Sequence, residues 1–389
     1  MNEAETSDCD RLQSYHVLAC LAALGVTGRY WPCLEAHGGP EQLARQGVEA
    51  VLGVLVQTGK ARRDERQMAQ LLQEALQQAR QLDNFVARGG WIMGACGSRE
   101  LMRLNRSRTP LLCAFFEGER QLLQQRPVVA IVGSRRACAR GLQRTQRLAG
   151  CLGREGVLVV SGAAVGTDCA AHEAAVQAGG RTLAILGEPL QPARSLLPDR
   201  LSHLPSDAIC ALTPYGPWVT PASFLFAARN QYMAAMADAV VIMQGTAGSG
   251  TLHTAKYARQ LGVALWAMPG DIEDPLAAAS NQLLQQGWAK AYIDPDSLLS
   301  ELIGTKKKSS ISVWTAMSAK KPLQLANMGL SDMQQQLLGM LHGGPGVVTV
   351  DELCQKLHIQ VQQLQGLLLE LELRSLIVRD GAQVRLGEV

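Results

Sequence analysis

The stretch VVAIVGSRR at residues 128–136 decides the fold of this chain. Its apolar residues predict a buried strand, which runs into a glycine, a serine and two arginines just before a helical stretch. In an open α/β sheet, ligands bind beyond the carboxyl ends of the strands, where helix N-termini offer free backbone N–H groups to phosphates. Gly133, Ser134 and Arg135 are therefore candidates for a phosphate site.

Arginines recur along the helix expected after this turn: Arg136, Arg140, Arg144 and Arg147. Their spacing places all of them on one stripe of a helix, and no acidic residue interrupts residues 127–153. Because stacked arginines repel one another, an unmixed stripe favours an anionic partner. A solvated or dimer-facing helix is the alternative interpretation.

Short β-branched runs alternate with Ala- and Leu-rich stretches further along the chain, at 157–160, 182–186, 239–243 and 263–268. This alternation predicts a parallel α/β sheet that ends near residue 300.

Two loops rich in small residues follow predicted strands. SGAAVGTD at 161–168 lets a backbone approach a ligand, with Asp168 as the expected N-cap, and GTAGSGTLHTA at 245–255 forms a second anion cradle at a helix start. Ser161, Asp168 and His172 build neither an oxyanion hole nor a nucleophile elbow, so no catalytic residue is expected and Asp168 and His172 are assigned structural roles.

The segment FLFAARNQ at 224–231 places aromatic rings beside one cation and one amide. Aromatic rings stack on bases while arginine and asparagine contact phosphates or base edges, which is typical of single-strand binding; core packing is the alternative. The 245–255 loop lacks the lysine of an ATP-binding phosphate loop, and no dinucleotide-binding glycine pattern is complete, so no cofactor is expected.

Bulk composition narrows the class of protein. The 389 residues carry a formal net charge of only +3, so any basic patch must be local. Ten cysteines without a C-x-x-C pair predict neither a metal site nor a disulfide scaffold, and no apolar run is long enough to predict a membrane span. With an acidic rather than basic N-terminus, the chain is expected to be cytoplasmic.

Taken in order, these motifs resemble the DNA-processing protein A (DprA/Smf) family. The matching segments are the G-S-R turn at 133–135, the loop at 161–168, F-x-x-R-N at 226–230, S-G-T-x-x-T-A at 249–255 and P-G at 269–270. The resemblance covers roughly residues 100–300 well and both flanks loosely.

The resemblance implies a non-enzymatic, non-sequence-specific single-stranded-DNA-binding mediator that protects incoming DNA and loads the RecA recombinase, as in natural transformation. It also implies a homodimer. By the same similarity and the spacing arguments above, the DNA-binding residues are expected to be Gly133, Ser134, Arg135, Arg136, Arg140, Ser161, Gly162, Phe226, Arg229, Asn230, Ser249 and Gly250.

The residue patterns along the chain, together with this resemblance, give the expected architecture, an α/β protein with a Rossmann-like parallel sheet core. The expected domains are a helical (SAM/helix-hairpin-like) N-terminal module at 1–90, the core at 91–303, a basic linker at 304–329 and a winged-helix-like domain at 330–389. Within the last domain, Thr349 to Glu352 fits a capping box and Asp380-Gly381 fits a hairpin turn.

Several positions depart from the family pattern. Gln231 stands where a second arginine is usual, Gly248 where a lysine often precedes S-G, and Leu212-Thr213 where the pair S-E is usual. We expect weaker phosphate binding, or compensation by the arginine stripe. The expected recognition helix, 360–373, has no lysine or arginine, which favours protein contact or dimer regulation over major-groove reading.

Two other functions are compatible with parts of this pattern. A nucleotide-processing enzyme of the lysine-decarboxylase-like (LOG) family shares a Rossmann-type core, but aligning Gly250-Thr251 with its loop puts Thr254 where that family has its catalytic glutamate. A regulatory module that binds a small nucleotide is the other alternative.

Overall fold

A computed structural model describes residues 13–60, 65–94, 102–303, 331–343, 347–357, 359–373, 376–380 and 383–386. The chain divides into two compact units, residues 1–307 and 308–389. The predicted basic linker, 304–329, lies outside the described residues, and the four-part domain division stays a prediction. No helix within the described residues combines the length and apolar character needed to cross a bilayer.

The first unit is built around a nine-stranded sheet with the order β1-β2-β6-β5-β4-β3-β7-β8-β9. The strands are β1 Trp91–Gly94, β2 Cys113–Gly118, β3 Val128–Val132, β4 Leu158–Ser161, β5 Thr182–Ile185, β6 Ile209–Thr213, β7 Ala239–Ile242, β8 Ala264–Ala267 and β9 Lys290–Ala291. All neighbours from β6 to β9 are parallel, which confirms the predicted sheet. The edge strand β1 and its neighbour β2 add antiparallel pairs that the sequence did not reveal.

The strand order reverses beside β3. From β3 the chain moves outward through β4, β5 and β6, then returns to place β7 on the other side of β3. The gap between the carboxyl ends of β3 and β7 is therefore a topological switch point, the place where open α/β sheets bind ligands.

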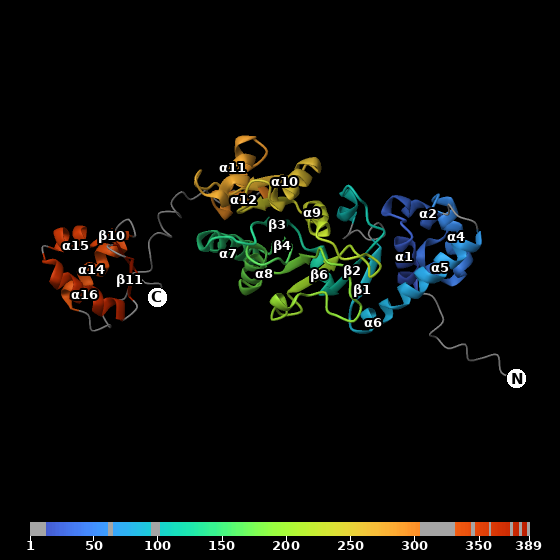
Figure 1. Cartoon of the computed structure of the whole chain (residues 1–389), viewed down its shortest axis with the longest axis horizontal. Helices are drawn as coiled ribbons and strands as arrows, with labels where there is room; N and C mark the ends of the chain where they lie inside the picture. Colours follow the sequence, from blue (N-terminus) through green and yellow to red (C-terminus); the bar gives the residue numbers. More distant parts are fainter. Residues whose placement is uncertain are drawn as a thin grey trace. The chain divides into compact units, whose positions relative to one another are not determined.

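Helices cover both faces of this sheet (Figure 1). One face packs on α7 Ala139–Arg154, α8 Thr167–Gln177 and α12 Pro295–Ile303, and the other on α9 Phe224–Met236, α10 Gly250–Gln260 and α11 Ala278–Gln285. Val129 and Ile131 contact the first layer, whereas Ala130 and Val132 contact the second. Burial on both faces explains why β3 is a continuous apolar run.

The N-terminal segment is helical, as expected. Its helices are α1 Ser14–Ala23, α2 Trp31–Ala36, α3 Gly39–Gln46, α4 Val48–Gln57, α5 Glu65–Arg80 and α6 Leu82–Ala87. They share one buried cluster with the β2 end of the sheet, in which Leu21 and Phe85 join Phe115. The Gly28 N–H also donates to the Pro110 carbonyl at 3.1 Å.

The second unit is a winged helix, as predicted. It contains α14 Asp332–Gly343, β10 Val347–Thr349, α15 Val350–Leu357, α16 Val361–Leu373, β11 Ile377–Asp380 and β12 Gln383–Leu386, with the sheet order β10-β12-β11. The capping box is confirmed: the Thr349 N–H donates to Glu352 Oε2 at 3.1 Å, and the Glu352 N–H donates to Thr349 Oγ1 at 3.3 Å.

Two helix starts differ from expectation. α7 begins at Ala139 with Cys138 as its N-cap, so Arg136 lies in the preceding turn and is not part of the helical stripe. Asp168 is not an N-cap, because α8 begins at Thr167 and Gly166 takes the cap position with φ +82°. A Cβ at Gly166 would lie 2.6 Å from the Ser134 carbonyl oxygen, so only glycine fits there.

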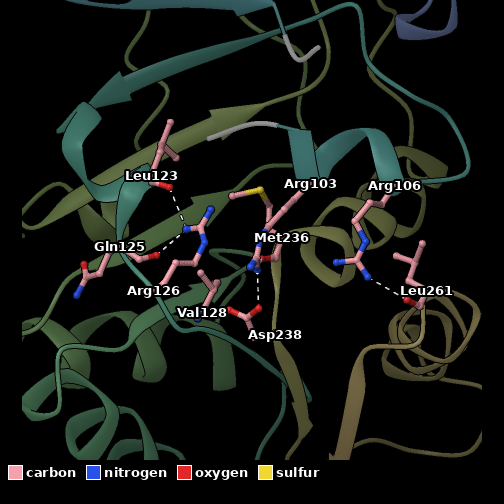
Figure 2. A network of polar contacts seen from close by, with 9 residues as sticks. All are labelled: Arg103, Arg106, Leu123, Gln125, Arg126, Val128, Met236, Asp238 and Leu261. Atoms are coloured by element: carbon pink, nitrogen blue, oxygen red, sulfur yellow. Dashed lines mark hydrogen bonds and ion pairs between the residues drawn. The ribbon is translucent and has the colours of Figure 1, made fainter. Parts of the chain in front are cut away.

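A polar network joins the amino-terminal ends of β3 and β7, at the opposite end of these strands from the switch point (Figure 2). Asp238 Oδ2 accepts from the Val128 N–H at 2.9 Å, and the Asp238 N–H donates to the Val128 carbonyl at 2.8 Å. Arg103 Nη1 lies 2.8 Å from Asp238 Oδ1 and 3.0 Å from the Met236 carbonyl oxygen. The two central strands are thereby held in register.

We expect Asp238→Ala to lower the free energy of unfolding by about 1 to 3 kcal/mol, because it removes a charge-assisted hydrogen bond and leaves the Val128 N–H without its acceptor. Urea unfolding measures the change. Asp207→Ala, at an exposed carboxylate, is the matched control and should change stability little. Equal effects of the two substitutions would contradict a role for the network.

Candidate functional site

A cavity of about 350 Å³ lies at the switch point. It is bounded by the turn after β3, the first turns of α9 and the loop before α10. We call it the switch-point cavity. Sequence-predicted residues that line it are Gly133, Ser134, Arg135, Phe226, Arg229, Asn230, Ser249 and Gly250.

The turn at 133–135 is held by close backbone packing. A Cβ at Gly133 would lie 2.4 Å from Thr167 Oγ1, so this position requires glycine. The Thr167 N–H donates to the Ser134 carbonyl at 3.2 Å, and Ser134 Oγ accepts from the Arg136 N–H at 3.0 Å. These contacts fix the backbone from which the Arg135 side chain extends.

The loop before α10 forms the opposite wall. Residues 246–248 are exposed, and Ser249 is the N-cap of the 11-residue helix α10. Asn230 Nδ2 donates to the Gly250 carbonyl at 3.2 Å, which ties this helix start to α9. Gly248 has φ +75°, a conformation that lysine rarely adopts, so the backbone conformation accounts for a glycine at this position. The helix N-terminus can accept an anion.

Buried polar residues form the floor of the site. Arg229 is only 4% exposed, and its Nη1 donates to the Gly162 carbonyl at 3.0 Å and to the Ile185 carbonyl. Ser161 is fully buried and donates to the Ile131 carbonyl at 2.6 Å. The structure thus directs both side chains to backbone carbonyls near the strand ends rather than toward solvent.

Asp168 accompanies Arg229 in this floor. Its Oδ2 accepts from the Ala164 N–H at 3.3 Å, and burial raises the pKa of its carboxyl group, while the Arg229 charge and hydrogen bonds oppose that rise. His172 is fully buried, with Nδ1 2.6 Å from Thr182 Oγ1, and burial lowers the pKa of its imidazole to about 3. His172 therefore occupies a buried structural position, whereas Asp168 lines the switch-point cavity and does not take the N-cap position that the sequence predicts.

The exposed cations lie above this floor. Arg135 is exposed and its guanidinium lies 5.6 Å from the centre of the Phe226 ring. Arg136 and Arg140 are exposed beside it but do not line the cavity, and Arg144 and Arg147 continue the exposed face of α7. A guanidinium over an aromatic ring offers a phosphate contact and a stacking surface together.

A second cavity of about 190 Å³ adjoins the first and shares Arg135, Ala164 and Phe226 with it. Gly162 lines this second cavity, which we call the side cavity. Glu188 and Arg200 also line it.

Some contributing residues escaped sequence reasoning. Gln244 Oε1 accepts from the Cys138 N–H at 3.1 Å and so positions the start of α7; its place directly beyond a strand end was the available signal. Glu188 and Arg200 lie between β5 and β6, Glu188 in a loop and Arg200 in the short 3-10 helix Asp199–Leu201, and this segment carries no compact motif. Within the described residues, no group of three or more potential metal-ligand side chains gathers.

Comparison with family models gives two matches. A model described as DNA recombination-mediator protein A matches residues 100–303, and one described as the DprA winged helix domain matches residues 321–383. The two matches fall on the sheet core and on the winged helix.

Two bacterial relatives are similar to this chain in sequence. The chain is 35% identical over 187 residues to a DNA processing protein DprA of Streptococcus pneumoniae, covering 48% of this chain and 65% of the relative. It is 32% identical over 196 residues to a Bacillus subtilis protein of the same description, covering 50% and 65%. The matches thus span about 65% of the length of these relatives.

A solved structure shares the fold. The X-ray structure of DprA from Streptococcus pneumoniae superposes with a TM-score of 0.59 at 26% identity. The superposition covers 75% of this chain and 99% of that one.

Proposed function

The chain belongs to the DNA recombination-mediator protein A family, and from that premise we propose that it binds single-stranded DNA at the switch-point cavity without reading an extended base sequence. The observation that carries the proposal is the exposed Arg135, whose guanidinium lies over the Phe226 ring and which lines the same cavity as the N-terminus of α10. Phosphates would contact the guanidinium and the helix N-terminus, and bases would stack on the ring.

The chemistry of the site suits a single strand better than a duplex. Phe224, the first residue of α9, does not line the cavity but is 68% exposed and adds a second aromatic surface. An unpaired strand presents its base faces to such rings, whereas stacked base pairs do not. The exposed arginines of α7 would extend the phosphate contacts and offset the missing cations at Gln231 and Gly248.

We propose further that the chain acts as a homodimeric, non-enzymatic mediator that protects incoming DNA and loads RecA. The description of the matching family model as a recombination mediator supports this proposal. We assign the winged helix to protein contact, since α16 carries Glu370 and Glu372 and no lysine or arginine.

RecA loading is tested by RecA filament assembly on an oligonucleotide coated with single-strand-binding protein. Faster assembly in the presence of the chain supports loading, and an unchanged rate contradicts it.

Binding of a labelled oligo-dT across a salt series tests the DNA proposal. We expect log K to fall linearly with log salt concentration, and the double substitution Arg140→Ala and Arg144→Ala to reduce the slope by about 1.4, because about 0.7 is lost for each of two phosphate contacts on a single strand. Fluorescence anisotropy gives both quantities.

Arg181→Ala is the control for that experiment, because Arg181 is exposed at the amino-terminal edge of β5, away from the cavity. An unchanged slope in the double variant would exclude the α7 arginines from the contact surface. Saturable binding of a mononucleotide without affinity for oligo-dT would instead favour a small-nucleotide regulatory module.

A further inference from the structure

We propose that the side cavity holds one base of the bound strand, and that Glu188 biases this subsite toward bases with an exocyclic amino group. The inference rests on the proposed function, because it concerns the same strand at the next position. It adds a preference at a single nucleotide to binding that otherwise depends on phosphates and stacking.

The dimensions of the side cavity fit one base. Its volume of about 190 Å³ is below the range of about 300 to 1,000 Å³ typical of drug-sized ligand sites. It shares Arg135 and Phe226 with the switch-point cavity, so a strand that occupies one is led directly into the other.

Small and apolar residues form much of the wall. A Cβ at Gly187 would lie 2.8 Å from a Phe226 ring carbon, so the ring packs directly on this backbone. Val165, on the loop after β4, lines the cavity and is 53% exposed. Such a wall accepts the apolar face of a base.

Two arginines line this cavity and would contact the phosphates on either side of the bound base. Arg200 Nε donates to the Ala163 carbonyl at 2.6 Å, which fixes the side chain. Within the described part of the chain, the terminal nitrogens of Arg200 make no hydrogen bond or ion pair. Arg135 is exposed on the shared side of the cavity.

Glu188 is the acidic residue among those that line the side cavity. Its backbone carbonyl accepts from Thr213 Oγ1 at 2.7 Å, which fixes the position from which the side chain extends. Although Arg135 and Arg200 line the same cavity, the ion pairs found among the described residues do not include Glu188. The carboxylate therefore remains open to a ligand.

A carboxylate that faces a polyanion is unfavourable unless the ligand offers it a hydrogen-bond donor. The N4 amino group of cytosine is such a donor, whereas thymine presents the O4 acceptor at the same place. The structure therefore points to a subsite that prefers cytosine, and amino-bearing bases generally, over thymine.

The test compares labelled dC and dT dodecamers with the full chain at pH 8, where cytosine is unprotonated. We expect the wild-type chain to bind oligo-dC about three- to tenfold more tightly than oligo-dT, consistent with one partly solvated carboxylate contact. In Glu188→Ala and Glu188→Gln the ratio should fall to about one, and oligo-dT should bind more tightly because a negative charge is gone. Glu155→Ala, an exposed carboxylate just beyond the end of α7, should keep the wild-type ratio.

The possible outcomes distinguish failure of the base preference at the side cavity from failure of the proposed DNA binding. Equal, salt-sensitive affinity of the wild-type chain for both oligonucleotides overturns the base bias and leaves the proposed function standing. A parallel gain for both oligonucleotides in Glu188→Ala, with an unchanged ratio, shows that the carboxylate only repels the backbone and also overturns the bias. Absence of binding to either oligonucleotide removes both proposals.

Discussion

Arg229→Ala is expected to lower the free energy of unfolding by about 3 to 5 kcal/mol, because it removes a buried cation that binds two backbone carbonyls and whose charge favours the neighbouring Asp168 carboxylate. Arg229 is 4% exposed and binds the carbonyls of Gly162 and Ile185, and its charge opposes the burial that raises the pKa of Asp168. Urea unfolding measures the loss, and Arg181→Ala, which removes an exposed arginine, should change stability little.

The loss of stability in Arg229→Ala should increase as the pH rises. The pKa of Asp168 is already raised in the folded chain, so its stabilising contribution is complete below the unfolded pKa and is lost as the pH rises through the folded pKa. Without Arg229 the folded pKa rises further. The stability difference between wild type and Arg229→Ala should therefore be larger at pH 8 than at pH 5, and a small difference that does not vary with pH would contradict the role given to this pair.

Arg135→Ala is expected to weaken oligo-dT binding about tenfold to a hundredfold at low salt, since a hydrogen bond to a charged phosphate contributes about 1.5 to 3 kcal/mol. Arg135 is exposed and its guanidinium lies over the Phe226 ring, so the fold should be little affected. Anisotropy titration gives the affinity, and thermal unfolding checks the fold.

Arg135→Lys keeps the charge but loses the planar face, so its affinity should lie between those of wild type and Arg135→Ala. Arg181→Ala should bind as wild type does. If Arg135→Ala and Arg181→Ala weaken binding equally, the effect comes from net charge alone, and the assignment of Arg135 to the DNA-binding site is wrong.

The sheet could be predicted from the sequence, and the candidate site could be placed at its strand ends, because the signals for both are local. β3 is buried on both faces, so its apolar run is continuous, and the turn that ends it carries the glycine and arginine of the site. The loops at 161–168 and 245–255 follow strands in the same way.

Other features depend on long-range contacts that no local pattern carries. β2 pairs with β6, so Phe115 opposite Thr213 is set by chain segments almost a hundred residues apart. Whether Arg229 faces solvent or the backbone depends on where the Ile185 and Gly162 carbonyls lie in the folded chain. The start of α7 depends on the thiol of Cys138, an unusual cap, which accepts from the Gly141 N–H at 3.4 Å.

Photo-cross-linking of an oligo-dT that carries 4-thiothymidine, followed by peptide mapping, tests most directly whether single-stranded DNA occupies the switch-point cavity. We expect adducts on the peptides that contain Phe226 and the 245–250 loop, reduced in Arg135→Ala and competed away by unlabelled oligo-dT. Adducts confined to the N-terminal helices or the winged helix, or no competable adduct, would contradict the account.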